Sequence, residues 1–374
     1  MKKILFFIES LGGGGAERVL YDIVSNIDRK KFSVIVKTVS DEGKYDEKIK
    51  KICTYKTLLR KSDYNSNGIK RYIYILKHWC IYHFPPNISY RLFVREKVDT
   101  EVGFVEGFAT KIISKKNTSC RKIAWVHVNP LERAYADKSF KNLEEQKQAY
   151  AVFDKIVCVS KSVKEGLEKK INQNKNVMVI YNPVNSEEIV KLASEHTDPK
   201  SESVIRFVSI GRLEEQKGYD RLIDAFALVS KKGYAFQLEI IGEGSQFENL
   251  KDKIQKYKLE NKIFLRGYLD NPYKYVADSD VFVCSSRAEG YSLVIAEAMV
   301  LGIPILTTNC SGPNELVDYG KYGIMTENTT QGIYEGIVQI LDNPQILQKY
   351  AKLSLKKAET INLEKTIRKI EKVL

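Results

Sequence analysis

A glycine-rich turn near the N-terminus constrains the fold of this chain more than any other segment. Residues 3–8 form a continuous apolar run, glycines occupy positions 12–15, residues 16–27 have amphipathic helical spacing, and residues 32–39 are rich in β-branched side chains. An apolar run of this length is typical of a buried parallel strand. The order of strand, tight turn, helix and strand therefore predicts a βαβ unit.

Strand and helix signals keep alternating, pause in a polar stretch, and then start again. Further first-half strands are expected at residues 101–105, 122–128, 155–159 and 177–180. Second-half strands are expected at residues 205–210, 236–241, 262–265, 281–285 and 304–308, with helices at 219–231, 247–257, 272–277 and 293–301. The pattern predicts an α/β fold with two Rossmann-like doubly wound domains facing across a cleft, and a ligand site at the carboxyl ends of the strands.

The length of 374 residues also favours two domains, because a single core rarely grows so large. We expect a first domain at residues 1–185, a linker rich in Ser, Glu and Asp at 186–203, and a second domain at 204–355. Residues 356–374 are expected to form a C-terminal helix that packs back on the first domain.

Composition excludes several classes of protein. A hydrophobic content of 43% excludes a disordered chain, and no apolar run reaches the roughly 20 residues that span a bilayer. The basic N-terminus resembles the start of a signal peptide. However, Glu9 interrupts the apolar run that would follow, and the glycines stand in place of a cleavage site. The six cysteines lie at least 26 positions apart, which indicates neither a zinc site nor a disulfide framework. We therefore expect a cytoplasmic protein.

The net charge of +13 is concentrated in the first half. Residues 1–185 carry 35 basic and 20 acidic residues, whereas residues 186–374 carry 25 and 27. Residues 69–84 read IKRYIYILKHWCIYHF, and this mixture predicts a membrane-surface helix that binds anionic headgroups through the region from Lys70 to Arg95. The alternative is a half-buried helix with a solvated basic face. No recognition helix, zinc finger or ribonucleoprotein motif supports nucleic-acid binding.

The glycine turn also suits an anion. Backbone N–H groups at Gly14 and Gly15 can approach a phosphate closely because no Cβ intervenes, and the following helix adds its positive end. Glu17 stands where the third glycine of a dinucleotide fingerprint belongs, and no Walker lysine follows. A tight turn without a ligand is the alternative.

A second candidate site combines two carboxylates eight positions apart, Glu289 and Glu297, at a strand-to-helix junction. Glu297 lies in an otherwise apolar run, where an unpartnered carboxylate is costly to bury, so we expect it to face a ligand. A diphosphate would rest on the N–H groups of residues 291–293. The alternative is a solvated loop acid and a helix acid paired with a lysine.

Two cations are expected at the same sheet edge. Arg212 follows the first strand of the second domain, and Lys217 precedes the next helix. Both suit a phosphate beside Glu289, although rim positions in solvent are the ordinary place for such side chains.

These residues carry a family resemblance that covers nearly all of the chain. The segments G-G-G-A-E-R, G-R-L-x-x-x-K-G, G-E-G, Arg266-Gly267-Tyr268 and E-x7-E occur in an order that resembles retaining family-4 glycosyltransferases of the GT-B fold. The resemblance implies an N-terminal acceptor-binding domain and a C-terminal nucleotide-sugar-binding domain. The segments around residues 101–107 and 122–128 are similar to those of glycosyltransferases that assemble capsules and exopolysaccharides in Gram-positive bacteria.

The resemblance also implies roles for individual residues in the donor site. Arg212 and Lys217 would neutralise the leaving diphosphate, Glu297 would bind the ribose hydroxyls, and Glu289 would bind hydroxyls of the donor sugar. Further donor contacts are implied at Gly14, Gly15, Arg266, Tyr268, Gly290, Tyr291, Ser292 and Leu293.

Three first-domain residues complete the expected site. His127 matches the histidine that lies beside the donor sugar in this family. The alternative is a core histidine whose ring hydrogen-bonds only to the protein. Glu106 and Asn129 are candidates for contacting the acceptor, which the resemblance implies to be a lipid-linked saccharide.

The implied reaction is a same-face substitution in which the departing phosphate oxygen takes the acceptor proton. It needs no carboxylate nucleophile, no cofactor and no metal, because cations and a helix N-terminus stabilise the leaving group. The expected partners are a UDP-sugar donor, a lipid-linked glycan and the anionic inner face of the cell membrane. A sugar-nucleotide epimerase of the same fold and a non-catalytic sugar-binding subunit remain as alternatives. A dehydrogenase is disfavoured, because this chain lacks the intact glycine fingerprint of a dinucleotide-binding domain.

Overall fold

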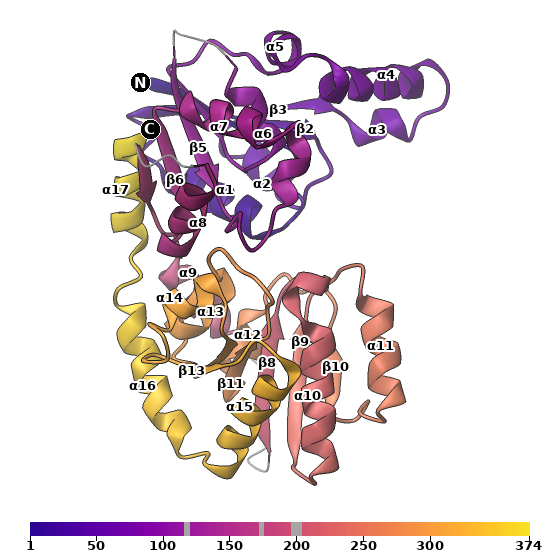
Figure 1. The fold of residues 1–374 in the computed structure, drawn as a ribbon, viewed down its shortest axis with the longest axis vertical. Coiled ribbons are helices and arrows are strands. Elements are labelled where there is room, and N and C mark those ends of the chain that lie inside the picture. Colours follow the sequence, from indigo (N-terminus) through magenta and orange to yellow (C-terminus); the bar gives the residue numbers. More distant parts are fainter. Residues whose placement is uncertain (116–119, 172–175, 196–203) are drawn as a thin grey trace. The chain divides into compact units, whose positions relative to one another are not determined.

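The computed structural model describes residues 1–374 except 116–119, 172–175 and 196–203. The chain divides into two compact units, each of which contains one parallel sheet with helices around it (Figure 1). The first unit comprises Met1–Pro183 and Glu364–Leu374, and the second comprises Val184–Leu363.

The first unit is built on a seven-stranded parallel sheet in the order β3-β2-β1-β4-β5-β6-β7. Its central strand is buried from Ile4 to Ile8, as a strand covered on both faces requires. The strands are β1 (Lys2–Ile8), β2 (Phe32–Ser40), β3 (Thr54–Leu59), β4 (Thr100–Gly103), β5 (Arg121–Val126), β6 (Lys155–Cys158) and β7 (Val177–Val179). The helices are α1 (Gly15–Asn26), α2 (Asp46–Lys50), α3 (Lys61–Tyr64), α4 (Ile69–His83), α5 (Pro86–Ser89), η1 (Tyr90–Val94), α6 (Phe108–Ile113), η2 (Tyr135–Ser139), α7 (Leu143–Ala151), α8 (Lys161–Ile171) and α17 (Leu363–Val373).

The second unit is built on a six-stranded parallel sheet in the order β10-β9-β8-β11-β12-β13. Neighbouring residues Phe207 and Val208 of β8 enter two different apolar clusters, because successive strand side chains point to opposite faces. The strands are β8 (Ile205–Ile210), β9 (Phe236–Ile241), β10 (Ile263–Leu265), β11 (Val281–Cys284), β12 (Ile305–Thr308) and β13 (Ile324–Thr326). The helices are α9 (Ser186–Ala193), η3 (Glu215–Lys217), α10 (Tyr219–Lys231), α11 (Phe247–Lys256), α12 (Tyr273–Ala277), α13 (Leu293–Val300), α14 (Ser311–Leu316), α15 (Thr330–Asp342) and α16 (Ile346–Ala358).

The two sheets share one topology. In each, the third, second and first strands of the unit lie on one side and the fourth and later strands on the other. The prediction of two Rossmann-like doubly wound units is therefore confirmed. In such sheets the strand order reverses between the first and fourth strands, and ligands bind outside the carboxyl ends at that point. The reversal lies between β1 and β4 in the first unit and between β8 and β11 in the second.

Two edge strands escaped the sequence prediction. β3 alternates exposed and half-buried residues and contains Lys56, so it lacks the apolar run of a central strand. β13 has only three residues. An edge strand has one paired neighbour and needs less apolar sequence, which explains why composition did not reveal either.

The ends of the second unit differ in detail from the expected segments. Within the expected linker, residues 186–193 form helix α9, whose Ile189 is buried in a second-unit cluster, while residues 196–203 lie outside the described part. At the C-terminus, the residues from Glu364 onward belong to the first unit. The Thr100 hydroxyl donates to the Leu374 carbonyl at 2.9 Å, and the Asp28 amide donates to Glu371 at 2.8 Å.

Candidate active site

The strongest polar feature at the switch point of the second unit is an ion pair between Lys217 and Glu289. Lys217 ends η3, which follows β8, and Glu289 lies in the loop after β11. The Ser286 hydroxyl donates to the same Glu289 oxygen at 2.9 Å. The two charged side chains are 20% and 11% exposed, so neither is a solvated rim charge. Burial opposes the charge on Lys217, but contact with Glu289 outweighs it and raises the Lys217 pKa.

The backbone after Lys217 turns in a way that only glycine tolerates easily. Gly218 has a φ of 68°, and a Cβ there would lie 2.2 Å from the Ser285 carbonyl oxygen. The Ser285 hydroxyl in turn donates to the Lys217 carbonyl at 2.8 Å. The Lys217 turn and the loop that leads to Glu289 are therefore packed against each other.

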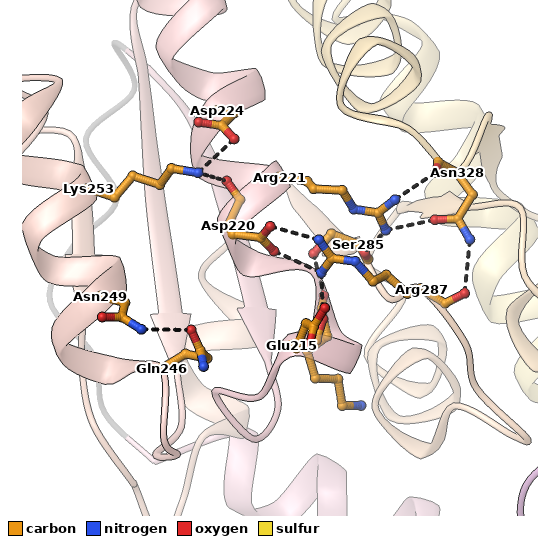
Figure 2. A network of polar contacts seen from close by, with 11 residues as sticks. Glu215, Asp220, Arg221, Asp224, Gln246, Asn249, Lys253, Ser285, Arg287 and Asn328 are labelled. Atoms are coloured by element: carbon orange, nitrogen blue, oxygen red, sulfur yellow. Dashed lines mark hydrogen bonds and ion pairs between the residues drawn. The ribbon is translucent and has the colours of Figure 1, made fainter. Parts of the chain in front are cut away.

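A network of side chains fixes this loop from the start of α10 (Figure 2). The Arg287 guanidinium contacts both carboxylate oxygens of Asp220, at 2.9 and 2.7 Å. Arg221 donates to the Ser285 carbonyl at 3.0 Å and to the Asn328 side chain at 2.7 Å. Asn328 donates back to the Arg287 carbonyl at 3.0 Å.

This network holds the main chain on both sides of Ser286, three residues before Glu289. Burial raises the pKa of Asp220, but the hydrogen bonds and charge of Arg287 outweigh it, so the Asp220 pKa is lowered and the pair is ionised. Asp220, Arg221, Arg287 and Asn328 were not predicted from the sequence, because they lie in different segments and no local motif joins them.

The start of α13 carries a buried hydroxyl group. Ser292 stands at the N-cap position and is 2% exposed, and its Oγ has no hydrogen-bond partner in the described chain. Its neighbours Gly290, Tyr291 and Leu293, which were predicted with it, lie at the same junction; Gly290 is buried, and Tyr291 and Leu293 are half-buried. A buried donor without a partner beside helix N–H groups suits an anion.

Glu297 has a partner that the sequence did not indicate. The Tyr273 hydroxyl of α12 donates to Glu297 Oε1 at 3.0 Å, and Tyr273 is buried. The tyrosine hydroxyl holds the Glu297 carboxylate in a fixed orientation at the second turn of α13.

The remaining predicted residues of the second unit differ in their exposure and in their hydrogen-bond partners. Arg212 is exposed, and its side chain has no partner in the part of the chain that the structure describes. Arg266 forms a bidentate pair with Glu239, with one contact at 2.9 Å. The Gly267 carbonyl accepts from the Gly242 amide at 2.8 Å, which fixes the main chain beside the 45% exposed Tyr268.

The first unit brings Glu106 and His127 together at the carboxyl edge of its sheet, after the neighbouring strands β4 and β5. Glu106 is 4% exposed and accepts hydrogen bonds from the His127 amide at 2.9 Å and the Tyr135 hydroxyl at 2.8 Å. Burial raises the pKa of Glu106, against the effect of these hydrogen bonds. Tyr135, in η2, was not predicted.

The His127 ring is held in one tautomer. Nε2 lies 2.9 Å from the Phe104 carbonyl oxygen, which can only accept, so Nε2 carries the hydrogen. Burial lowers the His127 pKa to about 4, and the imidazole is therefore neutral at pH 7. A neutral ring with Nδ1 as an acceptor is suited to a hydroxyl group rather than a phosphate.

Asn129 and the glycine turn have local structural partners. Asn129 is 8% exposed, and its side-chain oxygen accepts from the Leu131 amide at 3.1 Å. Gly14 is the N-cap of α1, which has no side-chain cap, and a Cβ on Gly14 would lie 2.6 Å from Glu17. Gly15 is the first residue of the helix. These contacts leave room for an anion at the start of α1, but they do not indicate which anion would bind there.

Two negative findings concern the described residues alone. In those ranges, no three His, Cys, Asp or Glu side chains are grouped to hold a metal ion. Outside the three undescribed segments, every helix is too short or too polar to cross a bilayer.

Family models match both halves of the chain. A model described as Glycosyltransferase Family 4 matches residues 13–188, and one described as Glycosyl transferases group 1 matches residues 191–357. Together they cover most of both units, including the segments that carry the site.

Individual relatives agree with these models. The chain is 29% identical to an uncharacterized glycosyltransferase of Methanocaldococcus jannaschii, over 79% of this chain and 77% of the relative. It is 25% identical, over the full length of both chains, to the N-acetylgalactosamine-N,N'-diacetylbacillosaminyl-diphospho-undecaprenol 4-alpha-N-acetylgalactosaminyltransferase of Campylobacter jejuni. The Anabaena protein Alr3699/HepE, solved with UDP-glucose, shares the fold with a TM-score of 0.74 at 17% identity, over 100% of this chain and 99% of that one.

Proposed function

This chain belongs to the family 4 glycosyltransferases of the GT-B fold, and we propose that it moves a hexose from a UDP-sugar to a lipid-linked saccharide with retention of configuration. The observation that carries the proposal is the Lys217–Glu289 pair at the switch point of the second sheet. A cation and a carboxylate in contact provide for both halves of a nucleotide-sugar, because the diphosphate needs positive charge and the sugar hydroxyls need acceptors.

In this proposal, the second unit binds the donor. Lys217 and Arg212 contact the diphosphate, which also rests on Ser292 and the N–H groups at the start of α13. Glu297, oriented by Tyr273, accepts from the ribose hydroxyls. Glu289 accepts from hydroxyls of the sugar, while the main chain at 266–268 contacts the base.

The chemistry follows from the charges. The bond between the anomeric carbon and the phosphate oxygen breaks, and Lys217 and Arg212 stabilise the negative charge that develops on the diphosphate. The acceptor hydroxyl attacks from the same face, and its proton passes to the departing phosphate oxygen. The site then needs no carboxylate nucleophile, and its cations supply the electrostatic stabilisation that a metal ion provides in other transferases.

We assign the acceptor to the first unit. Glu106 and Asn129 shape the loop that would contact it. Gly14 and Gly15 remain assigned to the donor phosphates through their N–H groups, and neutral His127 offers Nδ1 to a hydroxyl of the donor sugar. A lipid-linked saccharide is supported by the name of the Campylobacter jejuni relative, a transferase acting on a diphospho-undecaprenol substrate, and by the basic, apolar segment of the first unit. Such an acceptor places the enzyme at the inner face of the cell membrane, in surface polysaccharide assembly such as that of a capsule.

A donor screen tests this proposal. A panel of UDP-sugars and GDP-mannose is assayed by thermal shift, and we expect stabilisation by UDP and by one UDP-sugar. Calorimetry with UDP is then repeated for Arg212→Ala, with Lys251→Ala as an exposed-lysine control. Because charge-assisted hydrogen bonds contribute about 1.5–3 kcal/mol, the Arg212 variant should bind UDP at least about tenfold more weakly.

Product analysis separates the alternatives. Release of UDP with a lengthened saccharide supports transfer, an isomerised UDP-sugar supports an epimerase, and binding without turnover supports a non-catalytic subunit. Unchanged UDP affinity in Arg212→Ala would contradict the donor site as assigned.

A further inference from the structure

Helix α4 of the first unit exposes apolar side chains to an unusual degree. Of its 15 residues only Ile81 is buried. It lies with α3 at the end of an extension from the rest of the first unit (Figure 1). The helix is thus mostly exposed rather than half-buried, and its exposed residues are not limited to a basic face. The exposed large apolar residues of α4 are Ile69, Tyr72, Ile73, Ile75, Leu76, Trp79 and Tyr82.

Helical spacing places most of these residues on one side. At about 100° per residue, five of them share a single face, and the opposite face carries Ile81 and Tyr74. Ile81 is buried, and the Tyr74 ring contacts Tyr64 of α3 with 5.3 Å between centroids, so that opposite face is the one attached to the protein. We call the other side the outer face. The outer face consists of Ile69, Tyr72, Ile73, Leu76 and Trp79.

Cations border the outer face along one side. By the same spacing, Lys70 and Lys77 lie along this border, while Arg71 lies nearer the attached face, where its guanidinium is 5.3 Å from the centre of the Tyr64 ring. Helix α4 contains no acidic residue. Residues 60–97 carry eight Lys and Arg against two acids. One of the two, Glu96, is already paired with Lys37 and with a lysine of β3, at 2.8 Å each.

We infer that α4 is an in-plane membrane helix whose outer face enters the headgroup boundary of an anionic lipid surface. The arrangement fits that ligand in each respect. An apolar face enters the acyl boundary, Tyr72 and Trp79 suit the polar-apolar interface, and the bordering Lys70 and Lys77 reach anionic headgroups.

The charges favour lipid over a second copy of this chain. A symmetric dimer through the outer face would place the same surface against itself, and therefore one strongly basic segment against another. The like charges would repel, whereas anionic headgroups neutralise them. Dimerisation is thus the competing outcome of the test.

The purpose of this surface rests on the proposed lipid-linked acceptor, but its detection does not depend on transfer. A chain that binds vesicles and fails to bind UDP would contradict the proposed function and leave the membrane helix intact. A chain that binds UDP and extends a soluble saccharide, yet ignores vesicles, would overturn the membrane helix alone.

Tryptophan fluorescence gives a direct readout at the outer face. The chain has two tryptophans, Trp79, which is 51% exposed, and Trp125, which is buried at 1%. With full-length protein and vesicles of phosphatidylcholine plus phosphatidylglycerol, we expect Trp79 emission to shift to shorter wavelength and acrylamide quenching to fall. Pure phosphatidylcholine vesicles should cause little change, and Trp79→Phe should abolish the signal.

Matched substitutions test the apolar contribution. Ile73 and Val190 are both 54% exposed on helices, but Val190 belongs to α9 of the second unit. We expect Ile73→Glu to weaken vesicle co-sedimentation at least about tenfold and Val190→Glu to leave it unchanged. The triple variant Lys70→Glu, Arg71→Glu, Lys77→Glu should lose binding at low salt, where wild-type binding is strongest.

Three results would overturn the inference. They are an unchanged Trp79 spectrum on anionic vesicles, equal sedimentation of the Ile73 and Val190 variants, and a wild-type dimer in analytical ultracentrifugation that Ile73→Glu dissociates. Circular dichroism of each variant distinguishes loss of binding from loss of folding.

Discussion

The two units carry opposite chemistry at equivalent edges of sheets with the same strand order. In the second unit, Lys217 and Glu289 are in contact as a charged pair, and Arg212 stands exposed on the same strand-end loop. In the first unit, burial lowers the His127 pKa to about 4 and raises that of Glu106, so the edge is weakly charged. Burial maintains charge where an opposite charge is in contact and suppresses it where the neighbours are neutral.

This difference separates the position of the loops, which the topology sets, from their chemistry, which the side chains set. The strand order places loops at the switch point in both units, whatever their sequence. The side chains in those loops then give one edge an ion pair and an exposed arginine, and the other edge a neutral imidazole beside a buried carboxyl group. The predictions below test whether that division of work is real.

The largest effect is expected at the charged edge. Lys217→Ala removes the cation that we propose to face the leaving diphosphate and leaves Glu289 without this ion-pair partner, so kcat/KM for transfer should fall about 100- to 1000-fold. Glu289→Gln should lose transfer while UDP affinity changes less, because UDP lacks the transferred sugar whose hydroxyls Glu289 is proposed to bind. Steady-state rates of UDP release check both, with Lys251→Ala as control. Transfer within a few-fold of wild type in Lys217→Ala would remove the distinction between the edges.

A smaller effect is expected when the network around the charged edge is broken. Arg287→Lys keeps the charge but cannot contact both oxygens of Asp220, so the loop that carries Glu289 loses its fixed position. We expect kcat/KM to fall about tenfold at temperatures where circular dichroism shows a folded chain.

Arg368→Ala is the control for Arg287→Lys, since Arg368 forms an exposed pair with Glu364 in α17. Full activity in Arg287→Lys, or an equal loss in both variants, would show that the network does not position the loop.

The smallest effect concerns pH at the weakly charged edge. His127 takes up its proton at about pH 6.5 when unfolded but only near 4 when folded, so its contribution to stability falls as the pH drops from about 6.5 towards 4. Glu106 acts in the opposite sense, because its folded pKa is raised and protonation relieves its burial. The difference between wild type and His127→Asn isolates the histidine.

Urea unfolding over this pH range gives the measurement for His127. Wild-type stability should decline more steeply with falling pH than that of His127→Asn. Parallel curves would mean that the histidine titrates normally and that this edge is not neutral.

Local sequence determined the two sheets and the loops that carry the site. The apolar runs of β1 and β8, each followed by a turn and a helix, predict strands and crossovers without reference to the rest of the chain. Lys217 and Glu289 were expected at one edge because parallel strands align their carboxyl ends, and they lie in contact. The functional roles of these residues remain predictions.

Tertiary structure decided which side chains meet and which remain exposed. The Asp220–Arg287 pair and the Tyr273–Glu297 hydrogen bond join residues 67 and 24 positions apart, and no local pattern encodes such distances. Helices α4 and α13 both contain closely spaced large apolar residues, yet α13 is largely buried and α4 is exposed. Periodicity fixes which residues share a face of a helix, but only the packing of neighbouring elements determines whether that face is covered.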